Sequence, residues 1–138
     1  VKSMNAYMNC VALATFSYFD SGRNPSVETQ PERFYHGFVL GLSIELADRY
    51  IMTSNRESGF GRYDVMMEPK NGTDNAIIIE FKVRDSGEEK SLEDTADAAL
   101  KQIDKQRYQA ELESRGFHGG RIRKYGFAFE GKEVLIKK

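Results

Sequence analysis

An eight-residue run of strand-forming residues, Ala76-Ile-Ile-Ile-Glu-Phe-Lys-Val83, constrains the fold of this chain more than any other feature. In a β-strand, successive side chains point to opposite faces of the sheet. One face of the run is therefore wholly apolar, and the other carries Glu80 and Lys82 after Ile78. The pattern predicts a largely buried strand that holds an ion pair within very apolar surroundings.

A second strand is predicted from Arg62 to Glu68, where strand-forming residues again dominate. Turn-forming residues at positions 69–75 separate the two runs, which is typical of a β-hairpin. On this second strand Asp64 lies on the same face as Arg62.

The register of the hairpin decides what Asp64 faces. A tight turn centred on Asn71-Gly72 would place Asp64 opposite Ile79, pointing into the apolar layer. An odd-length loop or a bulge would instead place it opposite Glu80. We predict the second register, because an unpaired carboxylate among isoleucines costs several kcal/mol.

Two carboxylates that face each other across a strand pair repel unless a positive charge lies between them. Hard oxygen ligands such as Asp64 and Glu80 suit Mg²⁺ or Mn²⁺, which polarise a phosphoryl oxygen and activate a bound water. Lys82 can orient that water or neutralise charge on the phosphorus. The residues therefore predict metal-assisted phosphodiester hydrolysis, and a solvated strand face with a cross-strand ion pair is the alternative.

Helical patterns precede the hairpin. Apolar residues recur at helical spacing over residues 3–18, and again from about residue 30 to residue 50, after a capping box of Thr29 and Glu32. Residues 53–61 lack a steady period and fit an irregular strand or loop.

A further helix and a second hairpin follow the first hairpin. Ser91 and Asp94 resemble a capping box, and one apolar stripe runs from there to a helix end near Gly116. Alternating apolar residues then predict strands over residues 125–129 and 134–136. This order of elements predicts an α/β fold, an α+β sandwich in which helices flank a small mixed central sheet.

Length and composition limit the alternatives. We expect a single domain, because 138 residues support one core and hardly two. The formal charge of −1 gives no overall basic field, so any nucleic-acid contact must come from a local patch. The lone Cys10 and the lack of a signal peptide or long apolar run favour the cytoplasm over a membrane. The chain opens on Val1, which suggests a fragment of a longer protein.

The spacing of Asp64 and the triplet Glu80-Phe-Lys resembles the motif of the PD-(D/E)xK nuclease superfamily, whose core is restriction-endonuclease-like. The resemblance covers residues 29–138 and leaves residues 1–28 as an N-terminal helix and linker. Within the superfamily, the chain looks like nuclease-like domains found C-terminal to an AAA-ATPase-like domain. Three segments carry this likeness: residues 54–64, 77–82 and 124–129.

The resemblance implies a metal-dependent nuclease, most simply one that acts on DNA. An N-terminal AAA-ATPase-like domain would be its partner in the longer protein, and the oligomeric state stays open. The implied roles are metal ligation by Asp64, Glu80, the Phe81 carbonyl and Glu32, catalysis by Asp64, Glu80 and Lys82, and support from Gln102.

Two of these residues have structural alternatives. Glu32 is already explained as a helix cap by its spacing from Thr29. Gln102 lies on a polar helix stripe with Gln106 and Gln109, which fits a solvent-exposed face equally well.

The chain departs from the superfamily pattern at two points. Tyr63 replaces the nominal proline, and the interval from Gln102 to Tyr108 exceeds the Gln-x-x-x-Tyr spacing of the recombination-nuclease relatives. The role of Tyr108 is therefore open.

Arginines near the site are the candidates for phosphate contact. Arg56 and Arg62 are closest to Asp64 in sequence, and Arg62 lies opposite Lys82 in the predicted register. A denser basic stretch at residues 115–124 fits either a nucleic-acid patch or an ordinary solvated surface. The competing class of function is a non-catalytic nuclease-like module that binds nucleic acid or a partner ATPase domain.

Overall fold

A five-stranded mixed sheet forms the centre of the computed structural model, which describes residues 1–19, 37, 40–41, 43–57, 62–131 and 133–138. The strands stand side by side in chain order from β1 to β5. Their bounds are β1 Tyr50–Glu57, β2 Arg62–Pro69, β3 Ala76–Val83, β4 Ile122–Glu130 and β5 Glu133–Lys137. All neighbours are antiparallel except β3 and β4, which are parallel.

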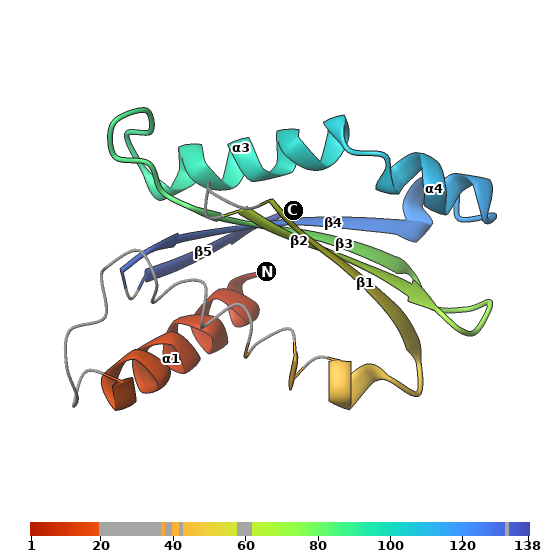
Figure 1. Cartoon of the computed structure of the whole chain (residues 1–138), viewed down its shortest axis with the longest axis horizontal. Coiled ribbons are helices and arrows are strands. Elements are labelled where there is room, and N and C mark those ends of the chain that lie inside the picture. The colour runs from red at the N-terminus through yellow and green to blue at the C-terminus, as the bar shows by residue number, and fades with distance from the viewer. Residues whose placement is uncertain (20–36, 38–39, 42, 58–61, 132) are drawn as a thin grey trace.

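Helices cover both faces of this sheet (Figure 1). Helix α1 (Lys2–Phe19) lies on one side, and α3 (Leu92–Lys105) and α4 (Tyr108–Ser114) lie on the other. The pair α3 and α4 forms the crossover that a parallel connection from β3 to β4 requires. The predicted small mixed sheet flanked by helices, an α+β fold, is confirmed.

The hairpin of β2 and β3 has the predicted register. Asp64 pairs with Glu80, and Arg62 pairs with Lys82. Strand β3 is buried over most of its length because it lies in the middle of the sheet with helices on both sides.

The two faces of the sheet carry separate apolar cores. On the α1 face, Phe81, Phe127 and Phe129 pack with the buried Met8 of α1. On the opposite face, Met66 and Ile78 pack against Ile103 of α3 and Leu112 of α4, together with Phe117.

The helix predicted to run from Ser91 to near Gly116 is in fact two helices. The capping box of Ser91 and Asp94 is confirmed, but α3 ends at Lys105 because Gln106 adopts an extended conformation, with φ −85° and ψ 157°. Helix α4 then ends beside Gly116, whose φ of 96° is a conformation that favours glycine.

The second predicted helix was extended too far. Helical residues are present at 43–46, but residues 47–49 form a turn and Tyr50 already opens β1. The predicted start of this helix, with Thr29 and Glu32, lies outside the described residues. Part of the segment predicted as irregular strand or loop, up to Glu57, is regular strand paired with β2.

Two asparagines of α1 cover the outer edge of β5. The side-chain amide of Asn5 donates to the Ile136 carbonyl at 3.1 Å and accepts from the Ile136 N–H at 2.6 Å. Asn9 makes the same two contacts with Val134, at 2.8 and 2.9 Å. The four helical residues from Asn5 to Asn9 rise by about 6 Å, which matches two strand residues at about 6.7 Å. The asparagines therefore satisfy backbone groups that an edge strand otherwise exposes.

The apolar residues at helical spacing in α1 include Met4, Tyr7 and Met8, but these three do not form one buried face. Met8 is fully buried, whereas Met4 and Tyr7 are largely exposed.

Among the described helices, none is long and apolar enough to cross a membrane.

We expect Asn5→Ala and Asn9→Ala each to lower the free energy of unfolding by about 1–3 kcal/mol, because each leaves a backbone donor and acceptor of β5 without its partner. Urea unfolding of the wild type and of both variants measures this change in the free energy of unfolding. The exposed neighbour Cys10→Ser is the control and should change stability by less than about 0.5 kcal/mol. Equal stability of all three variants would show that α1 does not hold the β5 edge.

Candidate metal centre

Two carboxylates lie opposite each other where the apolar core under α3 and α4 ends. Along β3, the buried Ile78 is followed on the same face by Glu80 and then Lys82. Along β2, which runs in the opposite direction, Asp64 precedes the buried Met66 on the same face and is the strand partner of Glu80. Asp64 is only 3% exposed and Glu80 only 2%, so their mutual repulsion is poorly screened by water.

Tyr108 holds one of these carboxylates in place. Its hydroxyl donates a 2.8 Å hydrogen bond to Asp64 Oδ1. Burial, and then the hydrogen bond to Asp64, raise the pKa of Tyr108, so the hydroxyl keeps its proton and acts as a donor.

The break between α3 and α4 makes the Tyr108 contact possible. In an unbroken helix, Tyr108 would lie five positions after the buried Ile103, about 140° around the helix axis, and would point away from the sheet. The extended Gln106 reorients the chain before Tyr108. In the sequence, the sign of this break is the unusually long interval from Gln102 to Tyr108.

Lys82 forms an ion pair with Glu89, a residue that the sequence analysis did not single out. Both side chains are mostly buried, at 14% and 9% exposed. The other carboxylate oxygen of Glu89, Oε2, accepts from the Thr95 hydroxyl at 2.7 Å and from the Asp85 N–H at 3.1 Å. A fully buried threonine among the apolar residues of α3 was the signal that a polar group lies nearby.

Small residues of β4 line the site on the other side. Gly126 pairs with Glu80, and Ala128 pairs with Lys82. Helix α3 packs so closely here that a Cβ atom on Gly126 would lie 2.5 Å from the Ala96 carbonyl oxygen.

The donor set fits a hard divalent cation. Asp64 and Glu80 supply carboxylate oxygens from adjacent strands, which is the chemistry that Mg²⁺ and Mn²⁺ prefer. Among the described residues, no group of three or more His, Cys, Asp or Glu side chains is placed to hold a metal. Glu32, the predicted acidic ligand from the first core helix, lies outside the described residues, and ligation by the Phe81 carbonyl stays a prediction.

Other predicted site residues are only partly placed. Gln102 is half-buried on α3, on the side of the helix that carries Thr95 and Ala99. The backbones of Arg56 and Arg62 lie in β1 and β2, but their side chains are outside the described part of the chain.

Several residues of the basic stretch have structural partners. Arg115 pairs with Glu68 and Glu111, and Lys124 lies 2.6 Å from Asp104. Arg121 donates at 2.8 Å to the carbonyls of Gly72 and Asp74, which ties it to the turn of the first hairpin. These contacts favour a structural role over a nucleic-acid patch.

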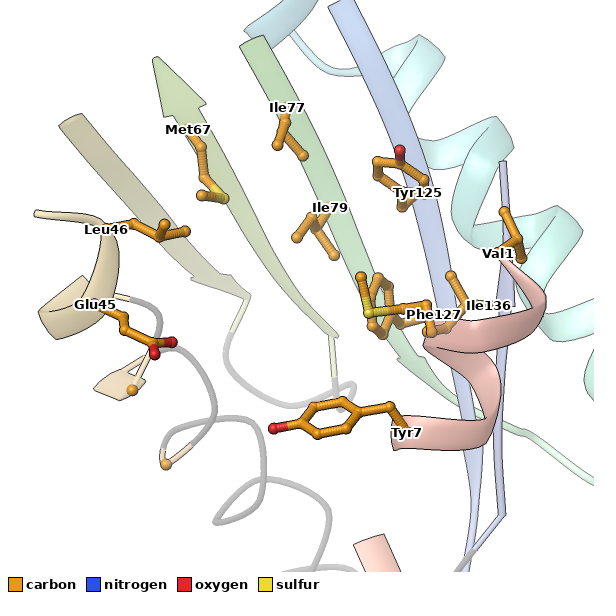
Figure 2. Close-up of a pocket in the computed structure, with 13 residues that line it drawn as sticks. Val1, Tyr7, Glu45, Leu46, Met67, Ile77, Ile79, Tyr125, Phe127 and Ile136 are labelled. Atoms are coloured by element: carbon orange, nitrogen blue, oxygen red, sulfur yellow. The ribbon is translucent and has the colours of Figure 1, made fainter. Parts of the chain in front are cut away.

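A cavity of about 680 Å³ lies on the opposite face of the sheet (Figure 2). Figure 2 shows Ile77, Ile79 and Phe127 on its sheet side, with Tyr7 of α1 nearby. Glu45 is the one acidic side chain among the described residues that line it. Such an apolar lining does not suit the chemistry of Asp64, Glu80 and Lys82, so the cavity is separate from the candidate metal centre.

We expect Gly126→Ala to lower the free energy of unfolding by about 1–3 kcal/mol, because the added methyl group meets the backbone of α3. Gly72→Ala is the control, since a methyl group added there would meet nothing within 4 Å. Urea titration of both variants makes the comparison. A Gly126→Ala protein as stable as the control would mean that α3 is not packed tightly on β4.

Comparison with known protein families assigns residues 30–138 to one described as the PD-(D/E)XK nuclease superfamily. Comparisons with curated proteins and with solved structures gave no match. The family match spans all five strands, α3 and α4, and it therefore includes Asp64, Glu80 and Lys82. This chain belongs to the PD-(D/E)XK nuclease superfamily.

Proposed function

We propose that this protein is a metal-dependent nuclease in which Asp64 and Glu80 bind Mg²⁺ or Mn²⁺ and Lys82 assists the attacking water. The observation that carries the proposal is the pairing of two buried carboxylates in adjacent strands, with Lys82 two residues further along the same face. Such an arrangement is electrostatically unfavourable without a cation and is therefore explained by one.

In this proposal each residue of the site has a separate role. Asp64 and Glu80 hold the cation, and the Tyr108 hydroxyl fixes the orientation of the Asp64 carboxylate. When bound, a divalent cation polarises a phosphoryl oxygen and lowers the pKa of a coordinated water. The Lys82 ammonium orients that water and stabilises the negative charge that develops on the phosphoryl group.

The family's remaining roles belong to the same proposal. The Phe81 carbonyl and Glu32 complete the ligand set, and Gln102 supports the site from α3. Membership of a nuclease superfamily favours a nucleic-acid substrate, and we propose DNA, with Arg56 and Arg62 contacting its phosphates.

We also propose a setting for the domain. Residues 29–138 form one nuclease core preceded by an N-terminal helix and linker, and in a longer cytoplasmic protein an AAA-ATPase-like domain would precede them. The match to residues 30–138 supports the extent of the core.

We expect Asp64→Asn to abolish Mn²⁺ binding and DNA cleavage while the protein stays folded, because asparagine keeps the hydrogen bond to Tyr108 but loses the charge. Calorimetric titration of Mn²⁺ and a cleavage assay on mixed DNA substrates measure the two effects. Glu133→Gln removes an exposed acid on β5 and is the control.

The same experiment separates the enzyme from the non-catalytic module. Mn²⁺ binding in the wild type that disappears in Asp64→Asn, with cleavage lost in parallel, supports the nuclease. A wild-type protein that binds no Mn²⁺ at millimolar concentration and cleaves nothing, yet binds DNA or an ATPase domain, would favour the module.

We expect Tyr108→Phe to weaken Mn²⁺ affinity or cleavage roughly 10- to 100-fold, because Asp64 loses the donor that orients it. The loss should be smaller than that of Asp64→Asn. Tyr125→Phe, on the other face of the sheet, is the matched control. Unchanged metal affinity and cleavage in Tyr108→Phe would show that the hydrogen bond to Asp64 has no functional part.

A further inference from the structure

The loop between β3 and α3 places a carboxylate against the site. Glu89 Oε1 contacts the Lys82 ammonium, and Glu89 Oε2 accepts from the Thr95 hydroxyl and the Asp85 N–H. Both oxygens are thus bound in different directions, which fixes the plane of the carboxylate. With 9% of its side chain exposed, Glu89 is unlike an ordinary surface glutamate.

The backbone that carries Glu89 is anchored as well. The Arg84 guanidinium donates to the carbonyls of Glu89, at 3.1 and 3.2 Å, and of Lys90, at 2.9 Å. Arg84 in turn donates its own N–H to the Phe129 carbonyl at 2.8 Å and pairs with Glu130. Two further N–H groups, those of Glu88 and Glu89, donate to the Asp85 carbonyl. The loop therefore presents Glu89 from a fixed position.

Charge balance indicates a role for the contact between Glu89 and Lys82. A divalent cation between Asp64 and Glu80 needs both of their negative charges. A lysine two residues from Glu80 would compete for the same carboxylates if it lacked a partner of its own. Glu89, in the loop after β3, gives the ammonium a carboxylate other than Asp64 and Glu80, which lessens that competition and gives the ammonium a defined place.

We propose that Glu89 is a positioning residue, which holds the Lys82 ammonium beside the metal centre in the geometry that catalysis requires. The inference rests on the proposed function, because it gives Glu89 a role through Lys82. Thr95 and Asp85 brace Glu89 in turn, and Arg84 fixes the loop that carries it.

The test compares Glu89→Gln with Glu88→Gln, its exposed neighbour in the same loop. The first measurement does not depend on nuclease activity. Lysine ammonium protons that are held in a buried ion pair exchange slowly with water, so we expect a side-chain ammonium signal for Lys82 in nitrogen-15 NMR. The signal is assigned to Lys82 by its absence from the spectrum of Lys82→Arg. We expect the signal in the wild type and Glu88→Gln, with and without Mg²⁺, and its loss in Glu89→Gln.

The second readout is kinetic. We expect kcat for DNA cleavage by Glu89→Gln to fall roughly 10- to 100-fold, with little change in KM or in Mn²⁺ affinity. Thr95→Val, which removes one brace and keeps the side-chain volume, should shift both readouts in the same direction by less. Thr95→Ser keeps the hydroxyl and should restore them. This series keeps the test decisive if Glu89→Gln folds poorly.

Three results would overturn the inference. The Lys82 signal could persist in Glu89→Gln, it could vanish from the wild type on addition of Mg²⁺, or Glu89→Gln could cleave as fast as the wild type or faster. Unchanged cleavage would mean that Glu89 has no part in catalysis, and faster cleavage would mean that it occludes the site. If the wild type cleaves no nucleic acid, the proposed function fails, and the NMR comparison alone decides whether Glu89 holds Lys82.

Discussion

The repulsion between Asp64 and Glu80 is the constraint on which the rest of this structure depends. The two carboxylates occupy paired positions in β2 and β3 and are almost completely buried. An antiparallel pair of strands would normally place apolar or oppositely charged residues there. The fold therefore carries an electrostatic cost at its centre, and the nearby polar groups, Tyr108 and Lys82, are arranged around it. In the proposed nuclease, a site of this kind trades stability for the ability to bind a cation.

The sequence predicted the strand pair correctly because burial allowed few alternatives. A one-residue slip between β2 and β3 would turn Asp64 into the apolar layer, so the cost of burying its charge, together with the turn at residues 69–75, selected its partner. Alternating apolar residues located the final hairpin, and the spacing of Ser91 and Asp94 located the capping box. These features follow from local periodicity and from the cost of burying charge, and both can be read from a single sequence.

The contacts that complete the site could not be predicted in this way. The apolar stripe continues from α3 into α4, so the pattern shows one helix and hides the break at Gln106 that brings Tyr108 to Asp64. Glu89 lies in a polar loop beside Glu88, and Thr95 on the apolar side of α3 indicates only that some polar group lies nearby, not which one. Both contacts depend on how a loop or a helix end sits over the sheet, which is decided by tertiary packing rather than by periodicity.

The apolar face of the sheet explains how β3 can carry an unfavourable charge arrangement without losing its position. Phe81, which lies between Glu80 and Lys82 in the chain, points to the opposite face. Its ring packs against Phe127 at 5.1 Å and Phe129 at 6.3 Å between centroids. Aromatic packing of this kind fixes the position of the β3 backbone from the opposite face of the sheet. The side chains of Glu80 and Lys82 are therefore presented by a strand whose position is fixed by aromatic side chains on the opposite face of the sheet.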